Sequence, residues 1–104
     1  MFHTQSVVIT SDRDPVELTG SVDTTGKYTL IARLRPTNSG GNGVFIGPET
    51  VGVNNGFLLS NDASMEGTIV MNPQVTLTLG AGEKVWAAQF TGTQQIVDIL
   101  AYSA

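Results

Sequence analysis

The chain contains no cysteine among its 104 residues. This absence excludes disulfide bonds, thiolate zinc sites and cysteine nucleophiles, although it does not determine the redox compartment. Charged residues are also scarce, at 13% of the chain against a typical value of about 25%. A surface with so few charges is built from Thr, Ser, Asn, Gln and Gly, and it loses less desolvation free energy when it docks onto another surface.

Basic residues are fewer than acidic ones, five against nine, which gives a net charge of -4. The basic residues are Lys27, Lys84, Arg13, Arg33 and Arg35. Proteins that bind nucleic acid need a positive patch, because neutralising phosphates supplies most of the affinity. These five residues are too few and too dispersed for that purpose, so we expect no nucleic-acid partner.

Long apolar runs are missing as well. None approaches the ~20 residues that a membrane-spanning helix needs, and we expect no membrane partner. Residues 1–6 lack the basic and apolar regions of a secretory signal, which predicts synthesis in the cytoplasm. A chain of this length is expected to form one domain, residues 1–104.

Groups that carry catalysis or bind metals are equally rare. His3 is the only histidine, and a lone terminal histidine without cysteine partners makes no convincing metal site. No G-x-S-x-G motif marks a nucleophilic serine. The segment Asp12-Arg13-Asp14 before Pro15 is typical of a turn and lacks the spaced ligands of a calcium loop. The sequence therefore predicts no enzyme, no metal and no cofactor.

Short runs of β-branched and alternating residues fill the chain, separated by Gly, Asn, Asp and Pro. The candidate strands are 5–10, 15–19, 27–35, 43–47, 57–60, 67–71, 74–80, 84–90 and 94–102. The connections are too short for parallel crossovers. The pattern predicts an all-β fold: an antiparallel β-sandwich, jelly-roll-like, of about eight short strands, with residues 1–6 as an extended N-terminal arm. Gly47 and Gly56 are expected in tight turns that need a positive φ.

Alternation assigns faces to two of these strands. In 28–35, Tyr28, Leu30, Ala32 and Leu34 share one face, which should be the core face. In 75–79 the apolar residues alternate with Thr76 and Thr78, so one side of that strand should be solvated.

The last two strands carry apolar residues on both faces. In 84–90, Trp86, Ala88 and Phe90 lie opposite Val85 and Ala87. In 94–102, the face with Ile96, Leu100 and Tyr102 lies opposite the face with Val97 and Ile99. A two-layer sandwich buries only one face of each sheet. We therefore expect the sheet containing both segments to be covered by another chain or by the N-terminal segment.

Asp98 lies on one of these apolar faces, beside Ile96 and Leu100. A buried carboxylate must be paired or neutralised. Arg33 or Arg35 could pair with it, from the same chain or from a neighbouring subunit. The alternative is a solvated Asp98 at an edge or surface position.

Three aromatic residues near the C-terminus, Trp86, Phe90 and Tyr102, could form a platform that binds sugars. Core packing or an oligomer contact is the commoner role for such residues.

Several segments resemble a known group of proteins. They are Val44-Phe45-Ile46-Gly47, Asn55-Gly56-Phe57-Leu58-Leu59, Leu77-Thr78-Leu79-Gly80-Ala81-Gly82-Glu83, Trp86-Ala87-Ala88 and Val97-Asp98-Ile99-Leu100-Ala101. In this order they resemble the small β-sandwich proteins encoded among the structural genes of tailed bacteriophages. The resemblance covers nearly the whole chain and is stronger after residue 43. The loop Ser60–Gly67 departs from the pattern.

The resemblance implies a virion component on the capsid surface, either a head decoration (cement) protein or a head-fibre base. Such proteins are often trimers that bind the major capsid protein at local three-fold positions. We expect a capsid decoration protein with two partners, the major capsid protein and further copies of itself. The alternative is a carbohydrate- or receptor-binding module of a head fibre or tail. The interface candidates are Phe2, His3, Arg33, Arg35, Trp86, Phe90, Ile96, Asp98, Leu100 and Tyr102.

Overall fold

A computed structural model describes residues 2–10, 14–35, 43–52, 54–60, 72–89 and 94–103. These residues form eight strands and no helix. The strands are β1 (Phe2–Ile9), β2 (Val16–Glu17), β3 (Tyr28–Leu34), β4 (Gly43–Gly47), β5 (Phe57–Ser60), β6 (Gln74–Leu79), β7 (Trp86–Gln89) and β8 (Gln95–Ser103). The predicted strand 67–71 lies outside the described residues. The other eight predicted strands are confirmed, 43–47 and 57–60 with the predicted ends and the other six with shifted ends.

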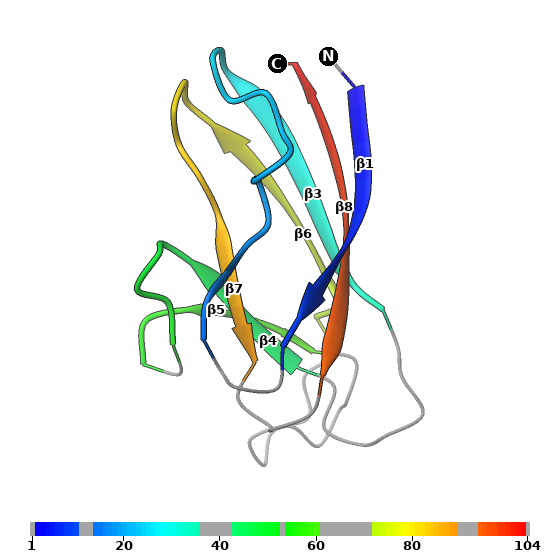
Figure 1. Cartoon of the computed structure of the whole chain (residues 1–104), viewed down its shortest axis with the longest axis vertical. Helices are drawn as coiled ribbons and strands as arrows, with labels where there is room; N and C mark the ends of the chain where they lie inside the picture. Colours follow the sequence, from blue (N-terminus) through cyan, green and yellow to red (C-terminus); the bar gives the residue numbers. More distant parts are fainter. Residues whose placement is uncertain are drawn as a thin grey trace.

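The strands form two antiparallel sheets of four, arranged like a sandwich (Figure 1). We call β1-β8-β3-β6 the long sheet and β2-β7-β4-β5 the short sheet, because the strands of the first are longer. The pairing is nested: β1 pairs with β8, β2 with β7, β3 with β6 and β4 with β5. Both chain ends consequently lie at the same end of the molecule (Figure 1).

The core lies between the two sheets and follows the expected alternation. Tyr28, Leu30, Ala32 and Leu34 of β3 are fully buried, and Arg33 between them is exposed. Val97, Ile99 and Ala101 give β8 the same buried row. Since successive residues of a strand point to opposite faces, these buried rows determine which residues face outward. The core assignment for 28–35 is confirmed.

The N-terminal residues differ from the prediction. Residues 2–6 are part of β1, which pairs with β8 from Phe2 opposite Tyr102 to Ile9 opposite Gln95, and so they form no separate arm. The physical reason is that β8 without β1 would present an unpaired backbone edge. Val7 and Ile9 of β1 also bury their side chains in the core. The N-terminal segment is therefore an edge strand of the sandwich.

The two closing strands also differ from the prediction, because they belong to different sheets. β7 pairs with β4 and β2 in the short sheet, whereas β8 pairs with β1 and β3 in the long sheet. The second apolar face of β7 is covered within the chain. A small cluster of Phe45, Val51 and Ala88 packs there with Leu58 and Trp86. The second apolar face of β8 lies on the side of the long sheet that points away from the short sheet.

Gly56 is needed for close packing and not for an unusual backbone angle. Among the described glycines only Gly82 has a positive φ, of 82°, so the positive φ predicted for Gly47 and Gly56 is wrong. A Cβ atom at Gly56 would lie 2.5 Å from Cβ of Phe45 and 2.8 Å from Cγ2 of Val51. The chain can pass this close to Phe45 and Val51 only because residue 56 has no side chain.

We predict that Gly56→Ala lowers the free energy of unfolding by about 1–3 kcal/mol, because the added methyl group overpacks the Phe45–Val51 contact. The matched control is Gly26→Ala, since no atom lies within 4 Å of a Cβ there, and we expect a change below about 0.5 kcal/mol. Urea unfolding of both variants measures the difference. Equal stability of the two variants would contradict the packing argument.

Candidate functional site

The structure brings most of the predicted interface residues together on one surface. We call it the outer face: the side of the long sheet that points away from the short sheet. It carries Phe2, Arg33, Arg35, Ile96, Asp98, Leu100 and Tyr102. They come from β1, β3 and β8, including the ends of the chain, and the register of these strands aligns them.

The remaining candidates lie elsewhere. His3 points to the opposite side of β1 and its Nε2 lies 3.2 Å from Oε1 of Gln5. Trp86 lies on the short sheet and packs against the Phe45 cluster. Phe90 lies outside the described residues. The outer face is therefore the one surface that combines several candidates.

On the outer face, apolar side chains of neighbouring strands lie opposite one another. Phe2 lies opposite Tyr102, and Leu100 lies opposite Ile31 on its other side. Phe2 is 75% exposed and Tyr102 is 37% exposed. Val8 is also exposed, at 46%. Such a cluster on a solvent-facing side is typical of an interaction surface.

Val8 and Ile31 belong to this surface, but they are not among the interface residues predicted from the sequence. Ile31 could have been found, because alternation already placed it with Arg33 and Arg35 on the second face of its strand. Val8 depends on β1 pairing with β8, where it lies opposite Ile96, and no local pattern indicates that pairing.

A polar cluster lies among these apolar residues. Nη2 of Arg35 donates to Oδ1 of Asp98 at 2.6 Å and Nε donates to Oδ2 at 3.1 Å, so the guanidinium grips both carboxylate oxygens. Arg35 also donates to Oγ of Ser6 at 2.8 Å, and Ser6 donates to Asp98. Of the two predicted states of Asp98, the paired one is confirmed, with the partner in the same chain.

The choice of Arg35 over Arg33 follows from register. Arg33 lies directly opposite Asp98, whereas Arg35 lies diagonal to it. From the diagonal position the guanidinium of Arg35 donates hydrogen bonds to both carboxylate oxygens of Asp98. Diagonal neighbours on one sheet face are within reach of long side chains. Arg33 is exposed and has no hydrogen bond or ion pair among the described residues. Its charge lies near Asp98 and contributes to lowering the pKa of that carboxyl group.

The pair also sets the protonation of Asp98. Hydrogen bonding from Arg35 is the main reason that the pKa of Asp98 lies below its usual value of 3.8; burial opposes it, and hydrogen bonding from Ser6 and the positive charges of Arg35 and Arg33 lower the pKa further. Asp98 is therefore ionised at neutral pH, and its charge is matched by Arg35.

The outer face is hollowed beside this cluster. A cavity of about 230 Å³ is lined by Ile31, Arg33, Gln74, Asp98, Ile99 and Leu100. It lies over β3, β6 and β8, and one apolar side chain of a partner could enter it. Neither Trp86 nor Tyr102 lines this cavity.

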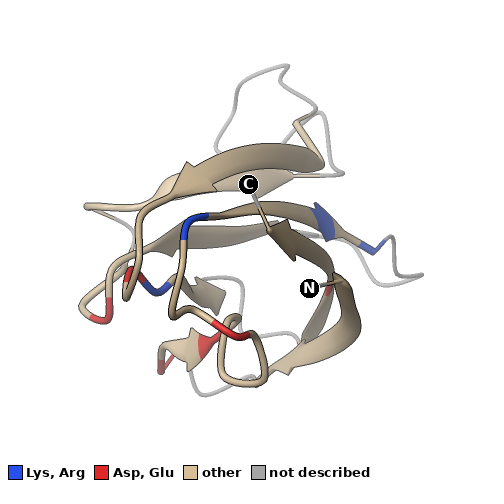
Figure 2. Cartoon of the chain, turned by 90° about the horizontal axis from the view of Figure 1, so that it is seen from above, with Lys and Arg blue, Asp and Glu red and all other residues tan. Residues whose placement is uncertain are grey.

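Among the described residues, no three His, Asp or Glu side chains are grouped so that they could hold a metal ion. None of the described segments is a helix long and apolar enough to span a membrane. In Figure 2 the Lys and Arg residues of the described segments lie at separate places along the ribbon and do not gather in one region.

Comparisons with known proteins give no match: no family model, no curated protein and no solved structure is significantly similar to this chain.

We predict that Asp98→Asn lowers the free energy of unfolding at pH 7 by about 0.5–1 kcal/mol, because it removes an ion pair whose Arg35 side chain is 47% exposed and hence screened by water. The difference from wild type should depend on pH. The folded-state pKa of Asp98 lies below the unfolded value, so the stabilisation is complete above that value and is lost as the pH falls through the folded-state pKa.

Urea unfolding of both proteins between pH 7 and pH 2 measures this dependence. Glu49→Gln is the control, since Glu49 is exposed and has no hydrogen bond or ion pair among the described residues. A difference between wild type and Asp98→Asn that stays constant down to pH 2 would show that the ion pair does not contribute.

Proposed function

We propose that this protein is a structural component of a tailed bacteriophage, a capsid decoration (cement) protein that binds the major capsid shell as a trimer. The observation that carries the proposal is the outer face. It presents exposed apolar residues around a neutralised Arg35–Asp98 pair, on a sheet whose other face already forms the core. A surface of this kind favours a protein partner.

The chemistry of the outer face suits docking. The carboxylate of Asp98 is already paired with Arg35 within the chain, so the docking of a partner does not leave Asp98 unmatched. Arg33 beside the hollow offers a charge that can orient an acidic partner group. The rest of the surface has few charges to desolvate. In the proposal, one part of this face contacts further copies and the protein sits on the virion surface.

We also propose that the sandwich is a jelly roll. The nested pairing of first with last, second with penultimate, and so on inward to β4 with β5 supports this. Such pairing results when one long hairpin folds over into two sheets, and viral capsid proteins use this architecture. A lectin can use it too, so the architecture does not by itself select the partner.

The proposal assigns the chain no catalytic role, no cofactor and no nucleic-acid partner. The single histidine of the chain, His3, lies on edge strand β1 and contacts Gln5 of the same strand. The opposing hypothesis, a module that binds carbohydrate or a receptor, required Trp86 or Tyr102 exposed in a groove. The packing of Trp86 against the Phe45 cluster gives that hypothesis no support.

We predict that the purified protein associates into trimers, with three times the 11.0 kDa chain mass, and sediments with empty expanded shells of the major capsid protein encoded in the same genome. Leu100→Lys should weaken both properties by at least about tenfold, because it places a charge in the centre of the apolar face. Light scattering and cosedimentation measure the two effects.

Ser21→Lys is the matched control, since Ser21 lies in an exposed turn between β2 and β3, outside the strands, and the change adds the same charge. Circular dichroism checks that both variants fold. A folded Leu100→Lys variant that still trimerises and decorates shells would overturn the role of the outer face. A monomer that ignores shells but binds glycans on an array would instead support the carbohydrate-binding alternative.

A further inference from the structure

One side of the sandwich is incompletely closed. On this side, which we call the open side, the edge strand β6 of the long sheet lies near β4 and β5, β5 being the edge strand of the short sheet. The inward residues Val75, Leu77 and Leu79 of β6 are only half-buried. On the opposite side, Val7 and Ile9 of the other edge strand are buried.

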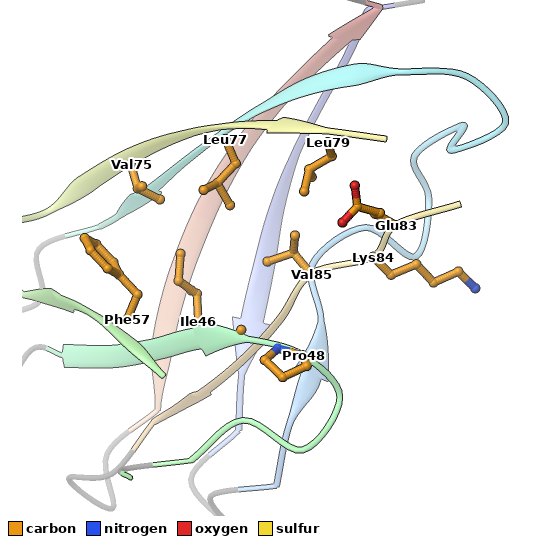
Figure 3. Close-up of a pocket in the computed structure, with 10 residues that line it drawn as sticks. Ile46, Pro48, Phe57, Val75, Leu77, Leu79, Glu83, Lys84 and Val85 are labelled. Atoms are coloured by element: carbon orange, nitrogen blue, oxygen red, sulfur yellow. The ribbon is translucent and has the colours of Figure 1, made fainter. Parts of the chain in front are cut away.

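A cavity of about 430 Å³ opens between the two sheets on this side. In Figure 3, Val75, Leu77 and Leu79 form one wall, and Ile46 and Phe57 form the wall opposite. Phe57 is 52% exposed. The lining is mostly apolar, with Glu83 and Lys84 at the end near Leu79 (Figure 3), so water in the rest of the cavity would gain few hydrogen bonds.

The backbone of β6 is unpaired along the same side. The amide of Leu34 donates to the carbonyl of Pro73 at 2.7 Å, so Pro73 directs its backbone toward β3. Backbone direction alternates along an antiparallel strand. The amides and carbonyls of Gln74, Thr76 and Thr78 must therefore point outward, and none has a partner among the described residues.

This edge has none of the usual protection. Natural edge strands are guarded against pairing with other chains by charges, prolines, bulges or very short length. β6 has six residues, Gln-Val-Thr-Leu-Thr-Leu, without a charge. A proline precedes both β6 and β2, but β2 has only two residues and contains Glu17. An unguarded edge beside an apolar cavity is suited to a partner that supplies both a strand and apolar side chains.

We propose that a second copy of this chain covers the open side, with β6 of the two copies paired antiparallel about a two-fold axis. The strand is complementary to itself in the register that places Leu77 on the two-fold axis. In this register Leu77 lies opposite Leu77 of the second copy, and Val75 lies opposite Leu79, all on the inner side of the sheet. Thr76 faces Thr78 on the outer side, and such threonine pairs favour strand pairing.

A second copy fits the open side better than an isolated peptide strand. A single strand would cover β6 but leave exposed Phe57 on the short sheet uncovered. A second sandwich has the same two layers, so its β6 and β5 meet their counterparts and close the cavity from both sheets. Self-pairing creates no repulsion, because β6 carries no charge. This contact uses the side of the sandwich, and it is independent of the function proposed for the outer face.

The absence of cysteine allows a direct test by cross-linking. Thr76→Cys and Thr78→Cys are made as separate variants, and one of them is labelled with nitrogen-15. Directly opposite residues of a hydrogen-bonded pair have Cα atoms about 5.5 Å apart, which a disulfide can span. We expect disulfide dimers in the mixture, of the mass of one labelled and one unlabelled chain, and few in either variant alone. A monomer at about 100 µM with no mixed disulfide would overturn the proposal; that concentration exceeds the Kd of most specific self-contacts.

A second test weakens the contact without touching the ladder to β3. Thr76→Pro removes an amide that points outward, and proline is tolerated at such edge positions. Thr76→Lys adds a charge at the edge. We expect each variant to raise the dimer dissociation constant, measured by analytical ultracentrifugation, by at least about tenfold, the effect of losing one or two hydrogen bonds. Ser21→Lys should leave it unchanged.

A chain with both self-contacts forms assemblies larger than the trimer or the edge dimer alone, and variants separate the two contacts. Thr76→Pro should abolish edge dimers and leave association through the outer face intact, whereas Leu100→Lys should do the reverse; Thr76→Lys does not serve here, because Thr76 lies opposite Ile31 on the outer face. If folded Thr76→Pro and Thr76→Lys both associate like wild type while Leu100→Lys does not, the edge proposal is wrong and the outer face alone carries self-association. If Thr76→Pro loses association and Leu100→Lys does not, the function proposed for the outer face fails and the edge contact stands.

Discussion

The register of β3 against β8 is the constraint on which the rest of the structure depends. These two strands lie in the centre of the long sheet, and their inward side chains form the fully buried middle of the core. A slip of one residue would turn every one of those side chains to solvent, so burial holds the register strongly. The same register places Arg35 diagonal to Asp98 and sets Leu100 beside Ile31. Burial on the inner face thus positions every contact on the outer face.

The outer face is completed by the pairing of the chain ends. β1 adds to β8 and brings Ser6, Phe2 and Val8 beside residues that lie some ninety positions later in the sequence. Ser6 then completes the hydrogen bonding of Arg35 and Asp98. The apolar residues and the neutral polar cluster therefore form one surface from three strands. This surface can dock onto a partner without leaving a buried charge unmatched.

The two sheets are unequal, and the inequality leaves the open side. The strands of the short sheet have two to five residues, against six to nine in the long sheet. β5 cannot cover the whole length of β6, so the inner row of β6 stays half-buried beside an apolar cavity. Elsewhere the short sheet is compact: Val51 covers its outer surface, and Gly56 lets the chain pass close to Phe45. Edge protection is therefore uneven around the sandwich.

Local patterns in the sequence are enough to predict the fold class, most strands and the inward faces of 28–35 and 75–79. These depend on period-two alternation and on turn residues, which act over a few positions. Tertiary structure alone decided that 84–90 and 94–102 separate into different sheets, that residues 2–6 join an edge, and that Arg35 rather than Arg33 holds Asp98. The close contact of residue 56 with Phe45 and Val51, which requires a glycine there, also appears only in the tertiary structure. Each of these depends on which strands become neighbours, and the pairing of distant strands leaves no local mark in a single sequence.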